Sequence, residues 1–159
     1  MATSLKILSD FSDSGSIPNA KAMRFGIVVS EWNAGITNAL YRAAFSTLVK
    51  YGAVEKNIQT LLVPGSFELT LGAHRLLLKT NIDAVICLGC VIQGETKHFD
   101  FICQAVAAGI TNLNIKHNKP AVFGVLTTNT LKQAEDRSGG KFGNKGEEAA
   151  LTAIKMLAL

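Results

Sequence analysis

The sequence is poor in cysteine, proline and aromatic residues: its 159 residues include three cysteines and three prolines, and 7% are aromatic. No apolar run is long enough to span a bilayer, and the first residues lack the basic and apolar blocks of a secretory signal. We therefore expect no membrane association. Three cysteines without such a signal fit a reducing compartment, and so we expect a cytoplasmic protein.

Several catalytic signatures are also missing. There is no P-loop lysine motif, which argues against a nucleoside triphosphate substrate, and no Gly-x-Ser-x-Gly turn. No group of His, Cys and carboxylate residues has the spacing of a zinc site, so we expect no metal. Cys87 and Cys90 have the spacing of a redox motif, but Cys87 falls inside a predicted strand, whereas a reactive pair needs a helix start.

The charge balance is mildly basic, with a formal net charge of +4. The lysines are scattered and aromatic residues do not alternate with them, whereas nucleic-acid binding needs a clustered basic face. We expect no nucleic-acid partner and a surface that suits anionic substrates. The chain is 48% hydrophobic with a mean hydropathy of +0.25. It can therefore bury a core, and we expect it to bury subunit interfaces as well.

Short apolar runs alternate with longer segments of helical periodicity. Within these runs polar and apolar residues do not alternate, which indicates a parallel sheet buried on both faces. We expect a three-layer α/β sandwich with a four-stranded, flavodoxin-like parallel sheet in the order 2-1-3-4 and helices on both faces. The predicted strands are 24–30, 58–63, 83–88 and 120–126, and the predicted helices are 33–51, 67–79, 97–117, 130–136 and 145–159.

The length fits one domain. Residues 1–22 are mixed in composition and rich in serine, and we expect an N-terminal arm there, followed by a single α/β domain over 23–159. In open parallel sheets ligands bind beyond the carboxyl ends of the strands. The residues that directly follow each predicted strand are therefore the candidates for a site.

The strongest candidate segment runs from Leu88 to Ile102. An apolar run ends there, with predicted turns at Gly89 and Gly94, and a helical pattern follows. A helix start leaves free backbone N–H groups that attract anions. Thr96 adds a hydroxyl, and His98 adds an imidazole that can give or take protons near neutral pH. This combination indicates chemistry on a phosphorylated small molecule.

Residues after the first two strands suggest how the rest of a substrate is held. Trp32 can stack on a flat heterocycle, or it can merely cover the end of the sheet, and Asn33 can be a simple helix cap. Ser66 lies in a turn with free N–H groups, and Glu68 lies in the first turn of a helix, where a carboxylate is favoured. Taken by itself, this turn fits a plain capping arrangement better than a binding site.

An anionic substrate also needs a cation, and Arg137 is the best candidate. A guanidinium can hold a phosphate by two parallel hydrogen bonds. The alternative is a surface ion pair with Glu135 or Asp136. His74 and His117 have no comparable setting, and we expect both on the surface.

Taken together, these segments resemble the lumazine synthase family over nearly the whole chain, from Phe25 to Met156. The resemblance rests on motifs in matching order: Glu31-Trp32-Asn33, Val63 to Leu69, Leu88 to Ile102, Phe123 to Thr128, Gln133 to Arg137 and Gly143 to Gly146.

The resemblance implies condensation of 5-amino-6-(D-ribitylamino)uracil with 3,4-dihydroxy-2-butanone 4-phosphate to 6,7-dimethyl-8-ribityllumazine, with release of phosphate and water and without any cofactor. It also implies a pentamer with sites between subunits. In many members twelve pentamers form a 60-subunit icosahedral shell, and riboflavin synthase is a further expected partner. The N-terminal arm is expected to pair with a neighbour's sheet edge.

Site roles follow from the same resemblance. It assigns the pyrimidine and its ribityl chain to Trp32, Asn33, Ser66, Phe67, Glu68, Cys90, Val91 and Ile92 of one subunit, and to Phe123 and Lys145 of the adjacent subunit. It assigns the butanone phosphate to Glu95, Thr96 and Arg137, and makes His98, with Arg137, catalytic. The chain departs from the family at Gln93, where Arg is frequent, and at Thr70, where Pro is common.

Two other functions fit parts of the pattern. A non-catalytic shell protein that binds flavin or lumazine would share the fold, but it would need neither His98 nor Arg137 nor Lys145. A flavodoxin-type electron carrier would need a hydroxyl-rich loop after the first strand, and residues 30–34 do not supply one. We therefore expect an enzyme, a transferase of riboflavin biosynthesis.

Overall fold

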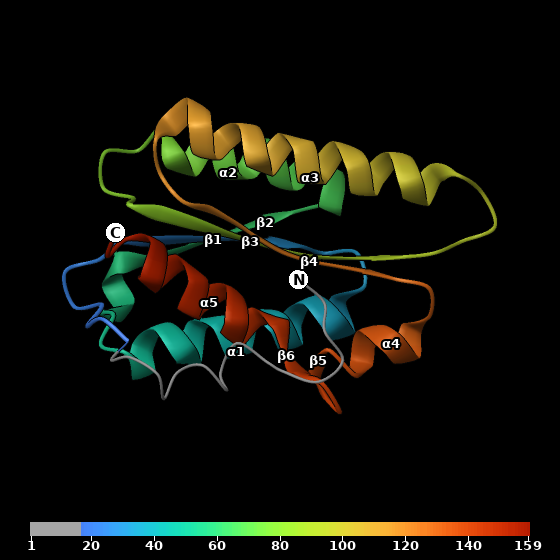
Figure 1. Ribbon diagram of the computed structural model, residues 1–159, viewed down its shortest axis with the longest axis horizontal. Helices are drawn as coiled ribbons and strands as arrows, with labels where there is room; N and C mark the ends of the chain where they lie inside the picture. Colours follow the sequence, from blue (N-terminus) through green and yellow to red (C-terminus); the bar gives the residue numbers. More distant parts are fainter. Residues whose placement is uncertain (1–16) are drawn as a thin grey trace.

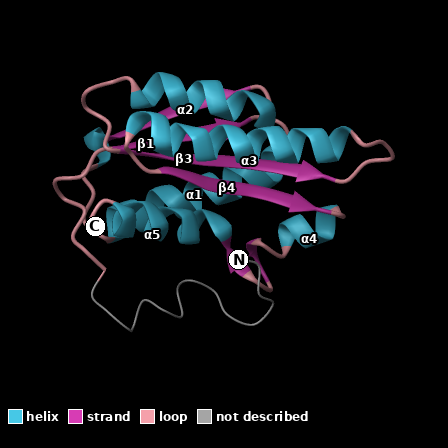
Figure 2. Cartoon of the chain, turned by 45° about the horizontal axis from the view of Figure 1, so that its top comes forward, coloured by secondary structure: helices cyan, strands magenta, loops and turns pink. Residues whose placement is uncertain are grey.

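The fold is built on a four-stranded parallel sheet in the order β2-β1-β3-β4, in the computed structural model, which describes residues 17–159. Its strands are β1 (Phe25–Ser30), β2 (Ile58–Val63), β3 (Ala84–Ile92) and β4 (Ala121–Thr128). The predicted sheet, including its strand order, is confirmed. Parallel strands point their carboxyl ends to one edge, and β3 and β4 show this common direction in Figure 2.

Helices cover both faces of the sheet and make the predicted three layers (Figure 1). On one face lie α2 (Leu69–Leu77) and α3 (His98–His117), and on the other lie α1 (Ala34–Lys50) and α5 (Lys145–Met156). The remaining elements are short: the 3-10 turns η2 (Glu55–Asn57) and η3 (Ser66–Glu68), the helix α4 (Leu131–Glu135), and a hairpin of β5 (Ser138–Gly140) and β6 (Gly143–Asn144).

The central strands β1 and β3 are buried on both sides, which explains their continuous apolar runs, whereas the edge strand β2 leaves Thr60 and Leu62 exposed. Side chains of successive residues point to opposite faces. In β3, Ile86 and Leu88 join the core beneath α1 and α5, whereas Val85 and Cys87 join the core beneath α2 and α3. All four side chains are fully buried.

One boundary prediction was wrong: the chain does not turn at Gly89. Instead β3 continues through Gly89, which is buried and paired with Val125 of β4, and ends at Ile92. The strand can continue because Gly89 fills a core position that has no room for a side chain. β4 likewise extends past its predicted end to Thr128, and the hairpin of β5 and β6 lies in a segment for which no strand was predicted.

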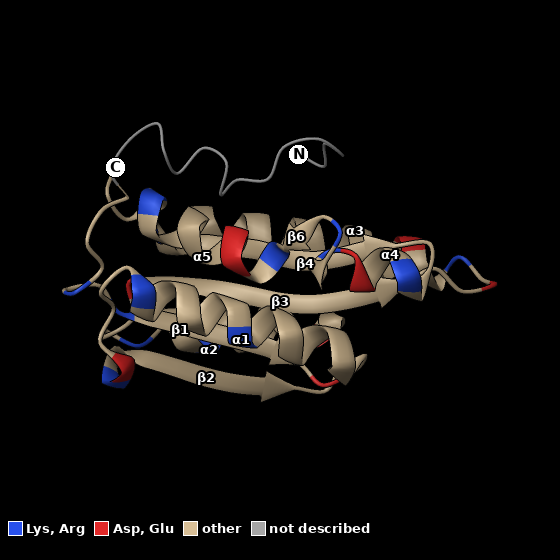
Figure 3. Ribbon diagram, turned by 90° about the horizontal axis from the view of Figure 1, so that it is seen from below, with Lys and Arg blue, Asp and Glu red and all other residues tan. Residues whose placement is uncertain are grey.

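Residues 1–16 of the predicted arm lie outside the described residues. The described part of it packs on the domain: Ala20 is fully buried and its backbone N–H donates to the Tyr51 carbonyl oxygen at 2.9 Å. Within residues 17–159, no helix combines the length and apolarity needed to cross a bilayer. Figure 3 shows charged residues of both signs on α4 and α5, whereas α1 carries only the basic residues Arg42 and Lys50.

Candidate functional site

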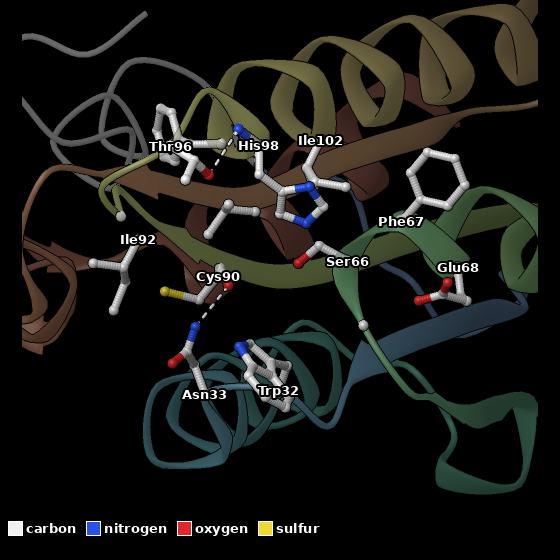
Figure 4. A pocket seen from close by; sticks show the side chains of 14 residues that line it. Trp32, Asn33, Ser66, Phe67, Glu68, Cys90, Ile92, Thr96, His98 and Ile102 are labelled. Atoms are coloured by element: carbon white, nitrogen blue, oxygen red, sulfur yellow. Dashed lines mark hydrogen bonds between the residues drawn. The ribbon is translucent and has the colours of Figure 1, made fainter.

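A cavity of about 780 Å³ opens at the carboxyl ends of the strands. It is lined by segments that follow β1 and β2, by the end of β3 and by the start of α3. The lining residues are Trp32, Asn33, Gly65, Ser66, Phe67, Glu68, Cys90, Val91, Ile92, Gly94, Thr96, His98, Phe99 and Ile102. Its size is in the range of pockets that hold small-molecule ligands, and Figure 4 shows its side chains.

Most of the predicted substrate residues therefore come together in one chain. The structure also adds Phe99 and Ile102, which the sequence reasoning missed. Helical spacing could have found Ile102, because it lies one turn after His98 on the same face. Glu95, Phe123, Arg137 and Lys145 do not line this cavity.

Asn33 does not cap α1 with its side chain. Its backbone is left-handed, with φ 60° and ψ 46°, and its amide Nδ2 donates to the Cys90 carbonyl oxygen at 2.9 Å. This bond joins the end of β1 to β3. Trp32, directly before it, keeps 73% of its surface exposed at the mouth of the cavity. An indole that covered the sheet end would be buried, so its exposure favours a role in stacking on a ligand.

Ser66 lies at the start of η3 and is 7% exposed. Its Oγ is buried and has no hydrogen-bond partner among the described residues. Buried hydroxyls in proteins are nearly always paired, so a ligand in the cavity is the natural partner. Glu68 follows two residues later, exposed at the rim.

The loop between β3 and α3 is held at its start by two hydrogen bonds that Gln93 donates. The N–H of Gln93 donates to the Thr128 carbonyl oxygen at 2.8 Å, and its side-chain amide donates to Gly94 O at 3.0 Å. Gly94 has open space around it. α3 begins at His98, whose N–H donates to Thr96 Oγ1 at 3.4 Å, and Figure 4 shows the imidazole directed into the cavity.

The cysteines of the suggested redox motif are both in β3 and buried. Burial raises the pKa of Cys87 to about 12 and that of Cys90 to about 11. A thiol must ionise to react, so this pair is chemically inert. Within residues 17–159, no three His, Cys, Asp or Glu side chains gather in a way that could hold a metal ion.

The comparisons with known proteins agree with this geometry. Residues 22–159 match the family model described as 6,7-dimethyl-8-ribityllumazine synthase. A protein of that name from Cytophaga hutchinsonii is 60% identical over 158 residues, covering 99% of this chain and 98% of the relative. Those from Phocaeicola vulgatus and Porphyromonas gingivalis are 55% and 52% identical, over 99% and 100% of this chain and 93% and 98% of the relatives. The chain belongs to the 6,7-dimethyl-8-ribityllumazine synthase family.

Family membership confirms the resemblance and directs attention to Arg137, Phe123 and Lys145, three of the four predicted residues that do not line the cavity. In this lumazine synthase family member, Arg137 donates to Gln133 O at 3.1 Å, and its guanidinium lies 4.8 Å from the Phe142 ring centroid. It makes no ion pair within residues 17–159, and Asp136 pairs with Lys132 at 2.8 Å. The surface ion pair considered for Arg137 is therefore not formed.

The other two residues lie on β4 and at the start of α5. Phe123 is 42% exposed although it belongs to a strand of the sheet. Lys145 forms an ion pair with Glu148 at 2.6 Å, with both side chains largely covered. Arg137, Phe123 and Lys145 are thus positioned on their own chain without taking part in its cavity.

Two further histidines form a pair between helices. His74 of α2 and His117 of α3 are half-buried, and His74 Nδ1 lies 2.8 Å from His117 Nε2, a hydrogen bond between the two helices. Burial, followed by the charges of His74, Lys116 and Lys119, lowers the pKa of His117. Both histidines lie at the surface as predicted but are partly covered, because the adjacent helices bring their rings together.

Proposed function

We propose that this chain is a transferase of riboflavin biosynthesis that condenses 5-amino-6-(D-ribitylamino)uracil with 3,4-dihydroxy-2-butanone 4-phosphate to 6,7-dimethyl-8-ribityllumazine, releasing phosphate and water. Family membership over residues 22–159 supports this reaction. The observation that carries it is the cavity itself, which collects an exposed indole, a buried free hydroxyl, a hydroxyl-bearing loop and an imidazole. Nothing in the comparisons favours a non-catalytic shell protein.

The pyrimidine end of the cavity is formed by the ends of β1 and β3. The Trp32 indole is exposed there and can stack on the heterocycle. Cys90, Val91 and Ile92 line the same space and would offer backbone groups to the pyrimidine, although the Cys90 carbonyl oxygen already accepts from Asn33. Ser66 and Glu68, together with Phe67 between them, form the wall that would hold the ribityl chain.

The phosphate end is the loop before α3. Gly94 leaves room for an anion, and Thr96 offers a hydroxyl. Glu95 lies in the same loop and would contribute its backbone N–H, because its carboxylate would repel a phosphate. His98 is placed one turn beyond, where it can move protons during imine formation and ring closure. Most of the rate enhancement would come from holding two substrates in register.

Among residues 17–159, no Lys or Arg lines the cavity, and we assign the role of a cation for the departing phosphate to Arg137 of a neighbouring subunit. Arg137, Phe123 and Lys145 lie outside this cavity but are held on their own chain. Exposed apolar side chains on α3, Phe101 and Ile115 among them, would be covered by subunit contacts. We propose a pentamer with sites between subunits, and twelve pentamers as its closed form.

The reaction is tested by mixing the purified protein with both substrates and following the absorbance of the lumazine product. Product growth in proportion to enzyme supports the proposal. Tight binding of product without turnover would instead indicate the non-catalytic shell protein, and neither binding nor turnover would overturn the assignment of this cavity.

The shared site has its own test. His98→Ala and Arg137→Ala subunits, each poorly active alone, are unfolded, mixed and reassembled. If the two residues serve one site from adjacent subunits, about a quarter of the sites regain both and activity returns in that proportion. Activity that stays at the level of the single variants would contradict a site built between subunits. Sedimentation of the same samples reports whether they are pentamers or 60-subunit shells.

A further inference from the structure

Gly89 of β3, a residue with no side chain, lies directly behind Ser66, one of the residues that line the cavity. Odd-numbered residues of β3 face α2 and α3: Val85 and Cys87 belong to that core, and Val91 packs against it. Gly89 falls between Cys87 and Val91 on this face. The space that a side chain would fill is instead occupied by Ser66 of η3 and by Leu69, the first residue of α2.

Ser66 and Leu69 pack closely against the backbone of Gly89. A Cβ built on Gly89 would lie 2.7 Å from Ser66 Oγ, 3.4 Å from Ser66 Cβ and 2.9 Å from Leu69 Cδ1. Real Cβ atoms do not tolerate the two shorter distances, so any side chain at this position would move Ser66 or Leu69. Leu69 is fully buried in the core, whereas Ser66 borders the open cavity. Ser66 is therefore the residue free to shift.

Ser66 is also the residue that has a hydrogen bond still to make. Its Oγ is buried without a partner among the described residues, an arrangement that is unfavourable unless a ligand completes it. Two positions along the same 3-10 turn, Glu68 offers an exposed carboxylate. A hydroxyl that both donates and accepts, beside a carboxylate that accepts, matches a chain of alcohol groups.

We propose that Gly89 is a positioning residue for polyol recognition: by lacking a side chain, it lets the Ser66 hydroxyl rest on the strand and face the sugar-alcohol chain of the pyrimidine substrate. The inference depends on the proposed function for the identity of that substrate, and goes beyond it in assigning a role to a strand residue that does not touch the ligand through a side chain.

The test measures equilibrium binding, so that it does not depend on turnover. Trp32 is the only tryptophan, and its fluorescence reports binding of the ribitylamino-pyrimidine and of an analogue whose pentyl chain carries no hydroxyls. Gly89→Ala should weaken binding of the ribityl compound by about tenfold and leave the pentyl compound within about twofold. Ser66→Ala should show the same selective loss.

The double variant separates an effect through Ser66 from general damage. If Gly89 acts through the Ser66 hydroxyl, Ser66→Ala/Gly89→Ala binds the ribityl compound no more weakly than Ser66→Ala. Gly26→Ala is the matched control: its Cβ would meet Leu76 Cδ1 at 2.8 Å, a comparable contact at the start of β1, far from the cavity. It should retain wild-type binding of both compounds.

Four outcomes would overturn the proposal: unchanged ribityl binding in Gly89→Ala, equal loss for both compounds, multiplicative losses in the double variant, or failure of the double variant to fold. If Gly89→Ala alone fails to fold, recovery of folding in the double variant supports it, because only the Ser66 oxygen differs between them. Wild-type protein that binds the ribityl compound but forms no product would refute the proposed reaction while leaving this inference intact.

Discussion

Asn33 and Cys90 are joined by a hydrogen bond of 2.9 Å, from the Asn33 amide to the Cys90 carbonyl oxygen. The bond connects the ends of two neighbouring strands below the exposed Trp32. It also accompanies a left-handed backbone, with φ 60° at Asn33. One residue thus provides both the turn and the crosslink that form this wall of the cavity.

The two contributions of Asn33 can be separated by substitution. Asn33→Gly keeps easy access to the left-handed conformation but loses the amide, and should lose about 1 kcal/mol of unfolding free energy. Asn33→Ala loses the amide and also strains the backbone, and should lose a further 1 kcal/mol or so. Chemical denaturation of the three proteins measures both steps, and equal stability of the two variants would show that the backbone is not strained.

Removal of the imidazole should slow product formation. His98→Ala should reduce kcat by about 10²-fold, the lower end of what proton transfer contributes, because positioning of the substrates survives. His74→Gln removes a histidine remote from the cavity and should leave kcat unchanged. Steady-state kinetics with both substrates decides the matter, and a His98→Ala enzyme with wild-type kcat would refute the catalytic assignment.

Two glycines at equivalent helix positions should respond oppositely to alanine. Gly146, second in α5, packs against the main chain of α1: a Cβ there would contact the Leu40 carbonyl oxygen and lie 2.7 Å from its carbonyl carbon. Gly146→Ala should lose about 3 kcal/mol or more, because backbone cannot move aside cheaply. Gly35, second in α1, has nothing within 4 Å, so Gly35→Ala should be neutral or up to about 1 kcal/mol more stable. Denaturant midpoints compare the two, and similar losses would contradict the close contact.

Stability should fall at mildly acidic pH. The pKa of His117 is lowered in the folded protein, mainly by burial and then by His74, Lys116 and Lys119. A lowered pKa means that the unfolded state binds the proton more readily, so this contribution is complete above about pH 6.5 and is lost as the pH falls below it. The Tm of the wild type should therefore drop more steeply between pH 7.5 and 5.5 than that of His117→Gln; identical pH profiles would argue against this role.

The thiols should resist modification. With pKa values of about 12 and 11, Cys87 and Cys90 are neutral at pH 8 and are also inaccessible. Cys103 is half-buried, and burial and Asp100 raise its pKa as well. An aromatic disulfide reagent should label at most one thiol rapidly in the native protein and all three after denaturation. The Cys103→Ser variant should then show no rapid labelling, and rapid reaction of all three native thiols would contradict the buried positions of Cys87 and Cys90.

Much of this fold was predictable because the central strands are buried on both faces. β1 is an example: its apolar run predicts a strand over 24–30, and the strand spans Phe25–Ser30 with every residue buried. The end of β3 was not predictable in the same way. A glycine signals a turn and a close backbone contact equally well, and only the packing of Ser66 on Gly89 distinguishes them.

The site residues likewise fall into those that the sequence pattern predicts and those that only the packing reveals. Residues that follow strands in sequence, such as Trp32, Ser66 and His98, are brought together by the sheet because parallel strands end at one edge. Phe99 and the pairing of His74 with His117 depend on helix rotation and helix packing, which local patterns do not specify. The role of every site residue stays a prediction, and Glu95, Phe123, Arg137 and Lys145 also lie outside the lining of this cavity.

The contact of Gly146 with Leu40 has a consequence for synthesis on the ribosome. α1 is among the first elements to be translated, but α5, which packs across it with Ala150 and Ile154 in the shared core, follows every strand of the sheet. Until α5 has been synthesised, the apolar side chains of α1 that pack against it remain exposed to solvent. Cotranslational folding would therefore pause at an incomplete intermediate, one that chaperones are suited to shield.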